Sequence, residues 1–460
     1  MTRNDSNDSS VDLESAGACE LAAAVAARRV SALELCDAAI RRIEHLDGDI
    51  NAVVVRDFDR ARAAARACDA LPADARLPLR GVPMTVKESF DVAGLPTSWG
   101  LPPFRQALAQ RDAVLVARLK AAGAVILGKT NLAAALADWQ TDNPVYGRTQ
   151  HPLDATRTPG GSSGGSGAAL AAGMVSLELG SDIGGSIRVP AHFCGVFGHK
   201  PSYGLLPARG HAFPLTDGAP TPIAVCGPLA RTARDLQRAF DVLAGPDEPE
   251  AVGYALVLPP PRHASLVGCR VALLDELPSA RADASVRDAL AQLAQRMQRA
   301  GARVEPAAAS LLPDLRALQE DYETALDAVF SRGDPSRQNA ISVHEWFSLL
   351  DRREHLRRHW RRFFDTVDVL LMPIFGTPAF QHIEEPDWDR RTLMIDGLPR
   401  PYAEQLAWSG LASLAGLPAT AVPAGKSREG LPIGLQVVGA YLEDLTTLAV
   451  ARQIEALVVA

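Results

Sequence analysis

The sequence has no apolar run near the roughly 20 residues that a membrane helix needs. Its first ten residues are polar and lack the apolar segment of a secretory signal. With a net charge of −7, the chain shows no electrostatic footprint for nucleic acid. These absences predict a cytoplasmic protein without a membrane or nucleic-acid partner.

The sequence also lacks the usual motifs of metal and phosphate sites. No Cys-x-x-Cys pair occurs, and His344-Glu345 is followed by Ser348 where a zinc protease needs a second histidine. A Gly-x-x-x-x-Gly-Lys-Ser/Thr loop is absent. We therefore expect no metal and no cofactor, and we interpret the six cysteines as small core residues in a reducing compartment, namely Cys19, Cys36, Cys68, Cys194, Cys226 and Cys269.

No linker divides the 460 residues, although that length by itself favours two domains. Hydrophobic residues make up 47% of the chain, which is enough for one large core. We therefore predict a disordered tail over residues 1–15 and a single domain over residues 16–460, with a catalytic core at about 75–240.

Apolar segments alternate between strand-like and helical spacing along the chain. Strand-like runs at 84–86, 125–127, 175–179 and 267–274 are separated by helical patterns at 112–121, 131–137, 167–172 and 285–300. This alternation predicts an α/β fold in which a mixed, mostly parallel twisted sheet is covered by helices on both faces. The stretch at about 310–366 is mostly helical in pattern, and we interpret it as a variable region beside the substrate entrance.

Two glycine-rich segments each present a serine: residues 159–166 (PGGSSGGS) and residues 180–188 (GSDIGGSIR). Glycines let the chain turn sharply, leave a hydroxyl accessible and direct N–H groups at a developing oxyanion. A serine is a weak nucleophile until a base removes its proton. Lys87 ends an apolar run (GVPMTVK), and burial would lower its pKa enough for it to act as that base.

Lys87, Ser162 and Ser186 lie in the order and spacing of the amidase signature family, which hydrolyses amides with a Ser–cis-Ser–Lys triad. The resemblance extends from about Leu21 to Val458. It implies that Ser186 is the nucleophile and that Ser162, after a cis bond from Gly161, relays the proton to Lys87.

The resemblance also implies roles for the neighbouring residues. The backbone N–H groups of Ile183, Gly184, Gly185 and Ser186 would form the oxyanion hole. Ser163, Asp182 and Arg188 would support the site, and Leu136, Trp139 and Phe375 would line the acyl pocket. No arginine cluster marks a carboxylate site, so we expect an apolar or aryl small-molecule amide as substrate, with a carbamate (urethane) or an ester as further possibilities. The chain could act as a monomer or a homodimer.

Two alternatives remain. Within the family, the chain could be the glutamine-hydrolysing A subunit of a glutamyl-tRNA amidotransferase, although Ala224-Val-Cys226 stands where that subunit has an Asp-Gln pair. Residues 160–164 also match the Gly-x-Ser-x-Gly elbow of Ser-His-Asp α/β-hydrolases, for which His192, His199 and His211 are candidate bases. The polar, proline-broken run before Gly160 argues against that elbow.

Overall fold

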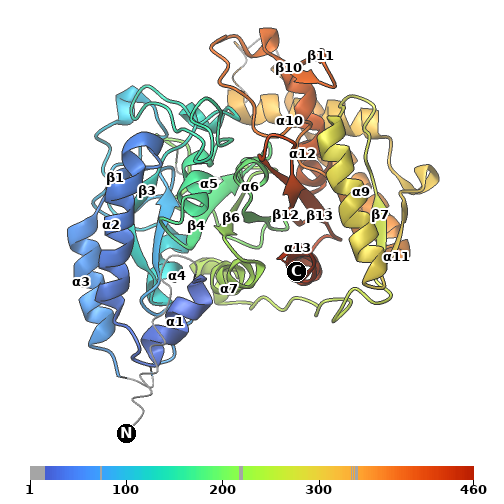
Figure 1. The fold of residues 1–460 in the computed structure, drawn as a ribbon. Coiled ribbons are helices and arrows are strands. Elements are labelled where there is room, and N and C mark those ends of the chain that lie inside the picture. Colours follow the sequence, from blue (N-terminus) through green and yellow to red (C-terminus); the bar gives the residue numbers. More distant parts are fainter. Residues whose placement is uncertain are drawn as a thin grey trace, which may run out of the picture.

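An 11-stranded sheet runs through the molecule in the order β1-β3-β2-β4-β6-β5-β12-β13-β9-β7-β8 (Figure 1). The computed structural model describes residues 16–459 except 73–74, 217–220, 333, 335 and 337–339, so the tail predicted at 1–15 lies outside the described residues. The strands are β1 (Val53–Arg56), β2 (Pro83–Lys87), β3 (Val125–Thr130), β4 (Leu177–Asp182), β5 (Phe197–Lys200), β6 (Val225–Ala230), β7 (Arg270–Leu273), β8 (Arg303–Pro306), β9 (Val369–Pro373), β12 (Ala419–Lys426) and β13 (Pro432–Val438).

The sheet is mixed, as the sequence predicts. The pairs β2–β3, β2–β4, β7–β8 and β7–β9 are parallel and lie towards its two ends. Antiparallel pairs fill the middle, where β12 and β13 form a hairpin and β6 returns beside β4. The parallel share is therefore smaller than the strand–helix alternation predicts, and of these central pairs only β12–β13 is a hairpin with a short connection.

Helices cover both faces of this sheet (Figure 1). Helices α5 (Gly164–Ala171) and α6 (Arg188–Cys194) pack on one face, while α7 (Ala233–Leu243), α9 (Ala284–Arg299) and α13 (Asp444–Val459) pack on the other. The remaining α-helices are α1 (Ala18–Ala26), α2 (Ala32–Ile50), α3 (Phe58–Asp69), α4 (Val114–Ala121), α8 (Glu248–Ala251), α10 (Leu315–Ser331), α11 (Val343–Thr366) and α12 (Leu406–Ala415).

Short elements complete the single α/β domain. A separate hairpin of β10 (Thr392–Ile395) and β11 (Leu398–Pro401) stands away from the large sheet, at the top of Figure 1. The 3-10 turns are η1 (Pro102–Phe104), η2 (Ala134–Leu136), η3 (Ala309–Leu311), η4 (Trp388–Arg390) and η5 (Tyr402–Gln405). The helical region predicted at 310–366 corresponds to α10 and α11.

The helix predicted over residues 131–137 is wrong. Only the short turn η2 forms there, and Ala135 and Leu136 have positive φ angles of 51° and 62°. The Asn131 side chain bonds to the Gly147 carbonyl and to the Thr149 hydroxyl, and it receives a bond from Asn143. These bonds replace the turns of a helix and hold the chain as an irregular loop, so tertiary contacts override the helix propensity of the alanines.

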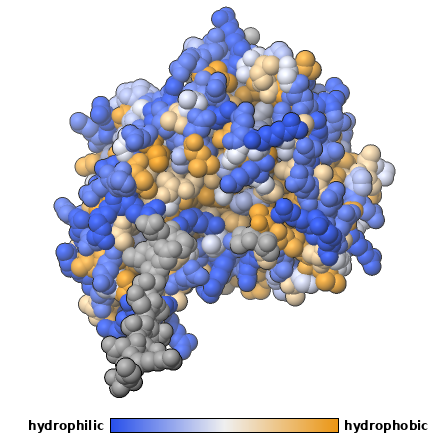
Figure 2. Space-filling view, in the orientation of Figure 1, coloured by the Kyte–Doolittle hydropathy of each residue, from blue (hydrophilic) through white to orange (hydrophobic). Residues whose placement is uncertain are grey.

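The face of the molecule shown in Figure 2 is largely polar. Figure 2 shows hydrophilic residues over most of the visible face, with apolar residues in small separate groups. No helix among the described residues combines the length and the apolar character needed to cross a membrane.

Candidate active site

Lys87 lies at the end of β2, and every residue of this strand is buried. Its Nζ atom donates hydrogen bonds to Ser162 Oγ at 2.7 Å and to Ser181 Oγ at 3.1 Å. The carboxylate of the next residue, Glu88, accepts hydrogen bonds from Ser98 and from the Trp99 N–H. It therefore binds a neighbouring loop and not Lys87.

Burial lowers the pKa of Lys87 to about 7, and the more distant charge of Asp182 only partly opposes this shift. The lysine is 0% exposed, and both of its bonded partners are hydroxyl groups. A neutral amine can accept a proton, so a large part of the Lys87 population is in the form that can act as a base at neutral pH.

The Gly161–Ser162 peptide bond is cis, as the resemblance implies. A side chain at position 161 would collide with the backbone of the preceding loop, because a Cβ atom there would lie 2.4 Å from the Asp138 carbonyl oxygen. Glycine is thus required for the close approach of these two segments. The Ser162 side chain is fully buried beside Lys87.

Ser186 lies in the turn between β4 and α6, which is built around Asp182. The Asp182 carboxylate accepts bonds from the N–H groups of Gly185, Ile187 and Arg188. It also forms a buried ion pair with the Arg188 guanidinium at 2.8 Å. Burial alone would raise the pKa of Asp182, but Arg188 lowers it to about 2, so Asp182 is ionised.

Arg188 is in turn held by α12 and β13. It donates to Gln436 Oε1 at 2.9 Å and to Ser413 Oγ at 2.9 Å. The Asp182–Arg188 pair thereby connects the Ser186 turn to two distant elements. The supporting role of the two residues in catalysis stays a prediction.

The four N–H groups predicted for the oxyanion hole are not equivalent. The Gly185 N–H is bonded to Asp182 at 3.0 Å. Among the described residues, no group of the chain accepts a bond from the N–H of Gly184 or Ser186. The Gly185 N–H is therefore already used by Asp182, whereas the oxyanion-hole role of Ile183, Gly184 and Ser186 stays a prediction.

The two serine segments contact each other through their backbones. The Ser163 N–H donates to the Ser186 carbonyl at 3.2 Å. Ser186 itself is 5% exposed. No hydrogen bond between the hydroxyls of Ser162 and Ser186 is present among the described contacts.

The predicted pocket residues Trp139 and Phe375 pack against each other edge to face, with ring centroids 5.0 Å apart. They are 3% and 0% exposed, whereas Leu136 is half-buried in the η2 turn. The Trp139 indole N–H donates to the Gly184 carbonyl at 2.8 Å. Trp139 is therefore an internal contact of the Ser186 turn, and its place in the acyl pocket, which the resemblance implies, stays a prediction.

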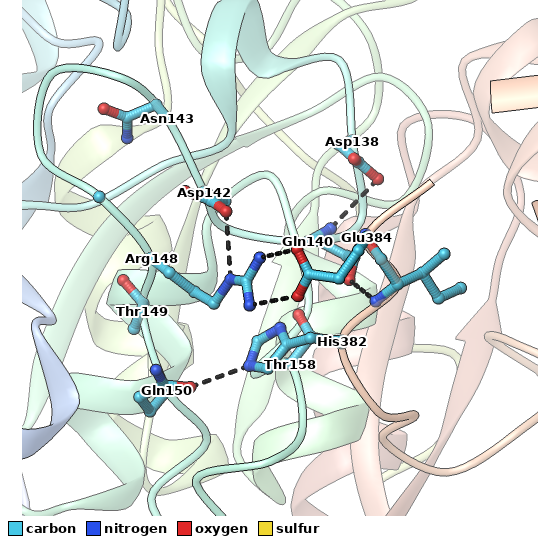
Figure 3. A network of polar contacts seen from close by, with 12 residues as sticks. Asp138, Gln140, Asp142, Asn143, Arg148, Thr149, Gln150, Thr158, His382 and Glu384 are labelled. Carbon is cyan, nitrogen blue, oxygen red and sulfur yellow. Dashed lines mark hydrogen bonds and ion pairs between the residues drawn. The ribbon is translucent and has the colours of Figure 1, made fainter. Parts of the chain in front are cut away.

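A polar network ties the loop that contains Trp139 to the segment after β9 (Figure 3). Arg148 forms a bidentate ion pair with Glu384 and a second ion pair with Asp142. Gln140 accepts a bond from the Ile383 N–H, and His382 pairs with Gln150. Several independent contacts therefore hold the two segments together.

The three histidines of the α/β-hydrolase alternative are bonded to other groups. His192 bonds to the backbone of Thr377 and Gly434. His199 bonds to Thr420 and Asp444, and His211 bonds to Ser89. None of the three is bonded to Ser162 or Ser186 in the described structure. The chain before Gly160 is also not a strand, so the geometry does not support this alternative.

The sequence analysis predicts no role for two side chains that contact the site. Ser181 is a second partner of Lys87, and Tyr322 of α10 donates to the Ile183 carbonyl at 2.9 Å. Ser181 could be found because it shares a strand end with Asp182, whereas Tyr322 is 139 positions from Ile183 and the sequence gives no signal for it.

Outside the serine segments, the part of the chain that the structure describes forms a cavity but no cluster of metal ligands. A cavity of about 390 Å³ lies between α3 and β3 and is lined by none of the predicted site residues. Among the described residues, no group of three or more His, Cys, Asp or Glu side chains is arranged to hold a metal ion.

The sequence of this chain matches a family of known proteins. The family model "Amidase" matches residues 34–328 and 315–448. AtzE, which belongs to the 1-carboxybiuret hydrolase of Pseudomonas sp. (strain ADP), is 34% identical, over 95% of this chain and 97% of that protein. The A subunit of the glutamyl-tRNA(Gln) amidotransferase of Anaeromyxobacter sp. (strain K) is also 34% identical, over 95% of each chain.

A solved structure agrees with these matches. The structure of 6-aminohexanoate cyclic dimer hydrolase complexed with substrate superposes with a TM-score of 0.81 at 26% identity, over 97% of this chain and 98% of that one. Sequence and fold thus point to the same group of hydrolases across nearly the whole length. The chain belongs to the amidase family, whose chemistry is the hydrolysis of amides.

Proposed function

We propose that this protein hydrolyses a carbon–nitrogen amide bond through a covalent acyl-enzyme on Ser186. The main support is the 2.7 Å contact between Lys87 Nζ and Ser162 Oγ in a fully buried setting. A buried lysine with a lowered pKa beside a serine is the pair needed to activate a hydroxyl nucleophile without histidine.

In the acylation step, the Ser186 hydroxyl gives its proton to Ser162 as its Oγ attacks the carbonyl carbon. Ser162 passes its own proton to Lys87, which becomes an ammonium. The tetrahedral intermediate then collapses, the carbon–nitrogen bond breaks, and the leaving amine takes the proton back through Ser162. Water releases the acid from the Ser186 ester by the same relay.

The relay requires the hydroxyls of Ser162 and Ser186 to meet when substrate is bound. Catalytic hydrogen bonds are often long or poorly aligned in free enzymes and tighten in the substrate complex. The Ser163–Ser186 backbone bond already keeps the two serine segments in contact.

The N–H groups of Gly184 and Ser186 are our candidates for the oxyanion hole, with Ile183 beside them. Donors placed where charge develops stabilise the transition state more than the ground state. A side chain at Gly185 would be strained at its φ of 94°, and its Cβ would lie 2.4 Å from the Ser409 hydroxyl. Glycine at this position keeps the turn in its observed shape.

We propose an uncharged apolar or aryl amide as substrate, with carbamates and esters as further candidates. The side of Gly184 is flanked by Tyr322 and Leu406, neither of which is charged. The nearby cation Arg188 is occupied by Asp182 and Gln436, so it is not available for a substrate carboxylate. A panel of anilides, aliphatic amides and aryl carbamates will rank these classes.

The second candidate is the A subunit of an amidotransferase, because one relative of that name is as similar to this chain as AtzE is. A stand-alone amidase, which we expect to act in the cytoplasm as a monomer or homodimer, hydrolyses panel amides when purified alone. An amidotransferase component would release ammonia from glutamine and depend on partner chains. The same assays, with the mass in solution measured alongside, separate the two.

The nucleophile can be tested without knowing the substrate. Diisopropyl fluorophosphate reacts with activated serines, and we expect one phosphoryl group per chain, on the peptide that contains Ser186. The Ser186→Ala variant is expected to remain unlabelled, while Ser176→Ala, which removes another buried serine, leaves labelling intact. Labelling that persists in the Ser186→Ala variant contradicts the proposal.

A further inference from the structure

Every backbone carbonyl of the turn from Ile183 to Ser186 accepts a hydrogen bond. The Gly185 carbonyl accepts from the Val189 N–H and the Ser186 carbonyl from the Ser163 N–H. The other two accept from side chains that come from distant parts of the chain. These are the Tyr322 hydroxyl on Ile183 and the Trp139 indole N–H on Gly184.

These two side-chain bonds fix the orientation of two peptide groups. The only cis bond among the described residues is Gly161–Ser162, so the Ile183–Gly184 peptide is trans. In a trans peptide the C=O and N–H bonds point in opposite directions. The bond from Tyr322 to the Ile183 carbonyl therefore turns the Gly184 N–H to the other side of the chain.

Trp139 acts on the following peptide in the same way. Its bond to the Gly184 carbonyl opposes the bond from the Gly185 N–H to Asp182. That peptide is held at both ends and cannot flip without losing two hydrogen bonds. Gly184 thus joins two peptide groups whose orientations are both fixed by hydrogen bonds, and its own N–H belongs to the first of them.

We infer that Tyr322 and Trp139 are positioning residues that hold the Gly184 N–H toward the reacting carbonyl of the substrate. This inference rests on the proposed function. Neither side chain contacts the reacting atoms in this scheme, and both act through the backbone of the turn. Preorganised donors stabilise an oxyanion because the protein does not need to reorganise during the reaction.

The surroundings of Tyr322 make it rigid. The residue is 0% exposed, and its ring lies directly on Gly410 of α12, where a Cβ atom would come within 2.4 Å of the Tyr322 ring. Any larger residue at 410 would displace the ring. The hydroxyl therefore has one position, beside Gly184 and the Ile183 carbonyl.

Trp139 is rigid for a different reason. Its ring contacts those of Phe375, Trp388 and Tyr402, with centroids about 5 Å away. The preceding Asp138 is held by Arg391 and by the Tyr402 hydroxyl at 2.9 Å. The segment shown in Figure 3 fastens the same loop at Gln140 and Arg148. We infer that this segment keeps Trp139 in place.

The direct test removes only the hydroxyl of Tyr322. In Tyr322→Phe we expect kcat for 4-nitrophenyl butyrate and the rate of Ser186 labelling by diisopropyl fluorophosphate to fall about tenfold, which is less than the loss of a direct oxyanion donor. We expect KM to change less than twofold, because the interaction belongs to the transition state. The midpoint of the pH profile is expected to stay unchanged.

The matched control is Tyr441→Phe. Tyr441 also donates its hydroxyl to a backbone carbonyl, that of Tyr203 at 3.0 Å, but it does not contact the Ser186 turn. We expect this variant to keep the wild-type kcat and labelling rate. If the melting temperature falls in both variants but the rate falls only in Tyr322→Phe, the loss of rate is due to positioning of the Ser186 turn. It is then not due to a general loss of stability.

A second variant covers the other bond. Trp139→Phe removes the indole donor, and we expect a fall in both rates of at least the size seen for Tyr322→Phe. An unchanged kcat and labelling rate in folded Tyr322→Phe overturns the inference, even if Ser186→Ala is inactive. Labelling that does not depend on Ser186 overturns the proposed function instead.

Discussion

The Nζ atom of Lys87 and the Oγ atom of Ser162 are 2.7 Å apart, and both side chains are fully buried. The second partner of the amine, Ser181, is also a hydroxyl. A charged ammonium in this setting lacks a bonded carboxylate, and its burial is therefore costly. The neutral amine is the form that fits the site, and this makes Lys87 the base in the proposed mechanism.

The first prediction concerns the two ends of the relay. We expect Ser186→Ala and Lys87→Ala each to lower kcat by on the order of 10⁴. The residues of a relay act as a unit, so the loss of one member removes nearly the whole rate enhancement that they provide together. Circular dichroism and thermal melting are expected to show a folded protein in both cases. The measurement is steady-state hydrolysis of the best panel amide.

Lys129→Met is the matched control for the loss of a buried lysine. Lys129 is also fully buried, its pKa is lowered by burial to about 8, and its amine bonds to Thr97 and the Pro96 carbonyl. We expect kcat to stay within a few-fold of the wild-type value. Near-normal turnover in folded Lys87→Ala would refute the mechanism.

The second prediction concerns the Asp182–Arg188 pair, in which both side chains are 0% exposed. Removing one partner leaves the other charge buried and alone, so we expect Arg188→Met to lower the free energy of unfolding by about 3–5 kcal/mol. Denaturant titration measures this. Arg287→Met, which breaks an exposed pair with Asp396, is expected to cost less than about 1 kcal/mol.

Much of the fold could be predicted from the sequence because its signals are local. The strand at 84–86, for example, lies within β2, and the helix at 285–300 differs from α9 by one residue at each end. The loop at 131–137 could not be predicted, since its shape depends on bonds from Asn131 to residues 16 and 18 positions away. Alternating elements likewise do not reveal which strands return antiparallel in the centre of the sheet.

In the site, too, features set by local sequence could be predicted, and features set by tertiary contacts could not. The relation of Lys87 to Ser162 could be predicted because fixed motifs contain both residues. The role of Trp139 could not, because it depends on which way one indole N–H points in three dimensions. Tyr322 was even less accessible, as a helix from the region expected beside the entrance brings it to the Ser186 turn.

The third prediction concerns metals. The proposed chemistry uses only serine hydroxyls, a lysine amine and backbone N–H groups, so we expect full activity after prolonged dialysis against EDTA. The measurement compares kcat before and after chelation, with metal content determined by elemental analysis. Activity that is lost on chelation and restored by a divalent ion contradicts the class of mechanism.

The fourth prediction links Lys87 to stability. Its pKa is about 7 in the folded protein and about 10.4 in an unfolded chain, so between these values the unfolded state binds more protons. Folding therefore pays a penalty at pH 7 that disappears as the pH rises to about 10.4. We expect Lys87→Met to be more stable than the wild type near pH 7 and to lose this advantage by about pH 10. A melting-temperature difference that does not depend on pH excludes a shifted Lys87.

The fifth prediction is the pH dependence of catalysis. The base must be neutral to accept a proton, so kcat/KM is expected to rise with pH through a midpoint near 7 and to level off above it. Histidine bases would behave differently here, because burial lowers the pKa of His192 to about 4 and that of His211 to about 3. A histidine limb would thus lie well below the lysine limb.

The control for this profile is Lys200, whose pKa burial also lowers to about 7 and whose amine bonds to the Pro201 carbonyl. Since Lys200 is not bonded to either serine, we expect Lys200→Met to keep the midpoint, as should a double variant that replaces His192 and His199 with glutamine. In Lys87→Ala the residual rate is expected to lose the break near pH 7. If the limb instead disappears with the histidines and survives without Lys87, the base is a histidine and the lysine is structural.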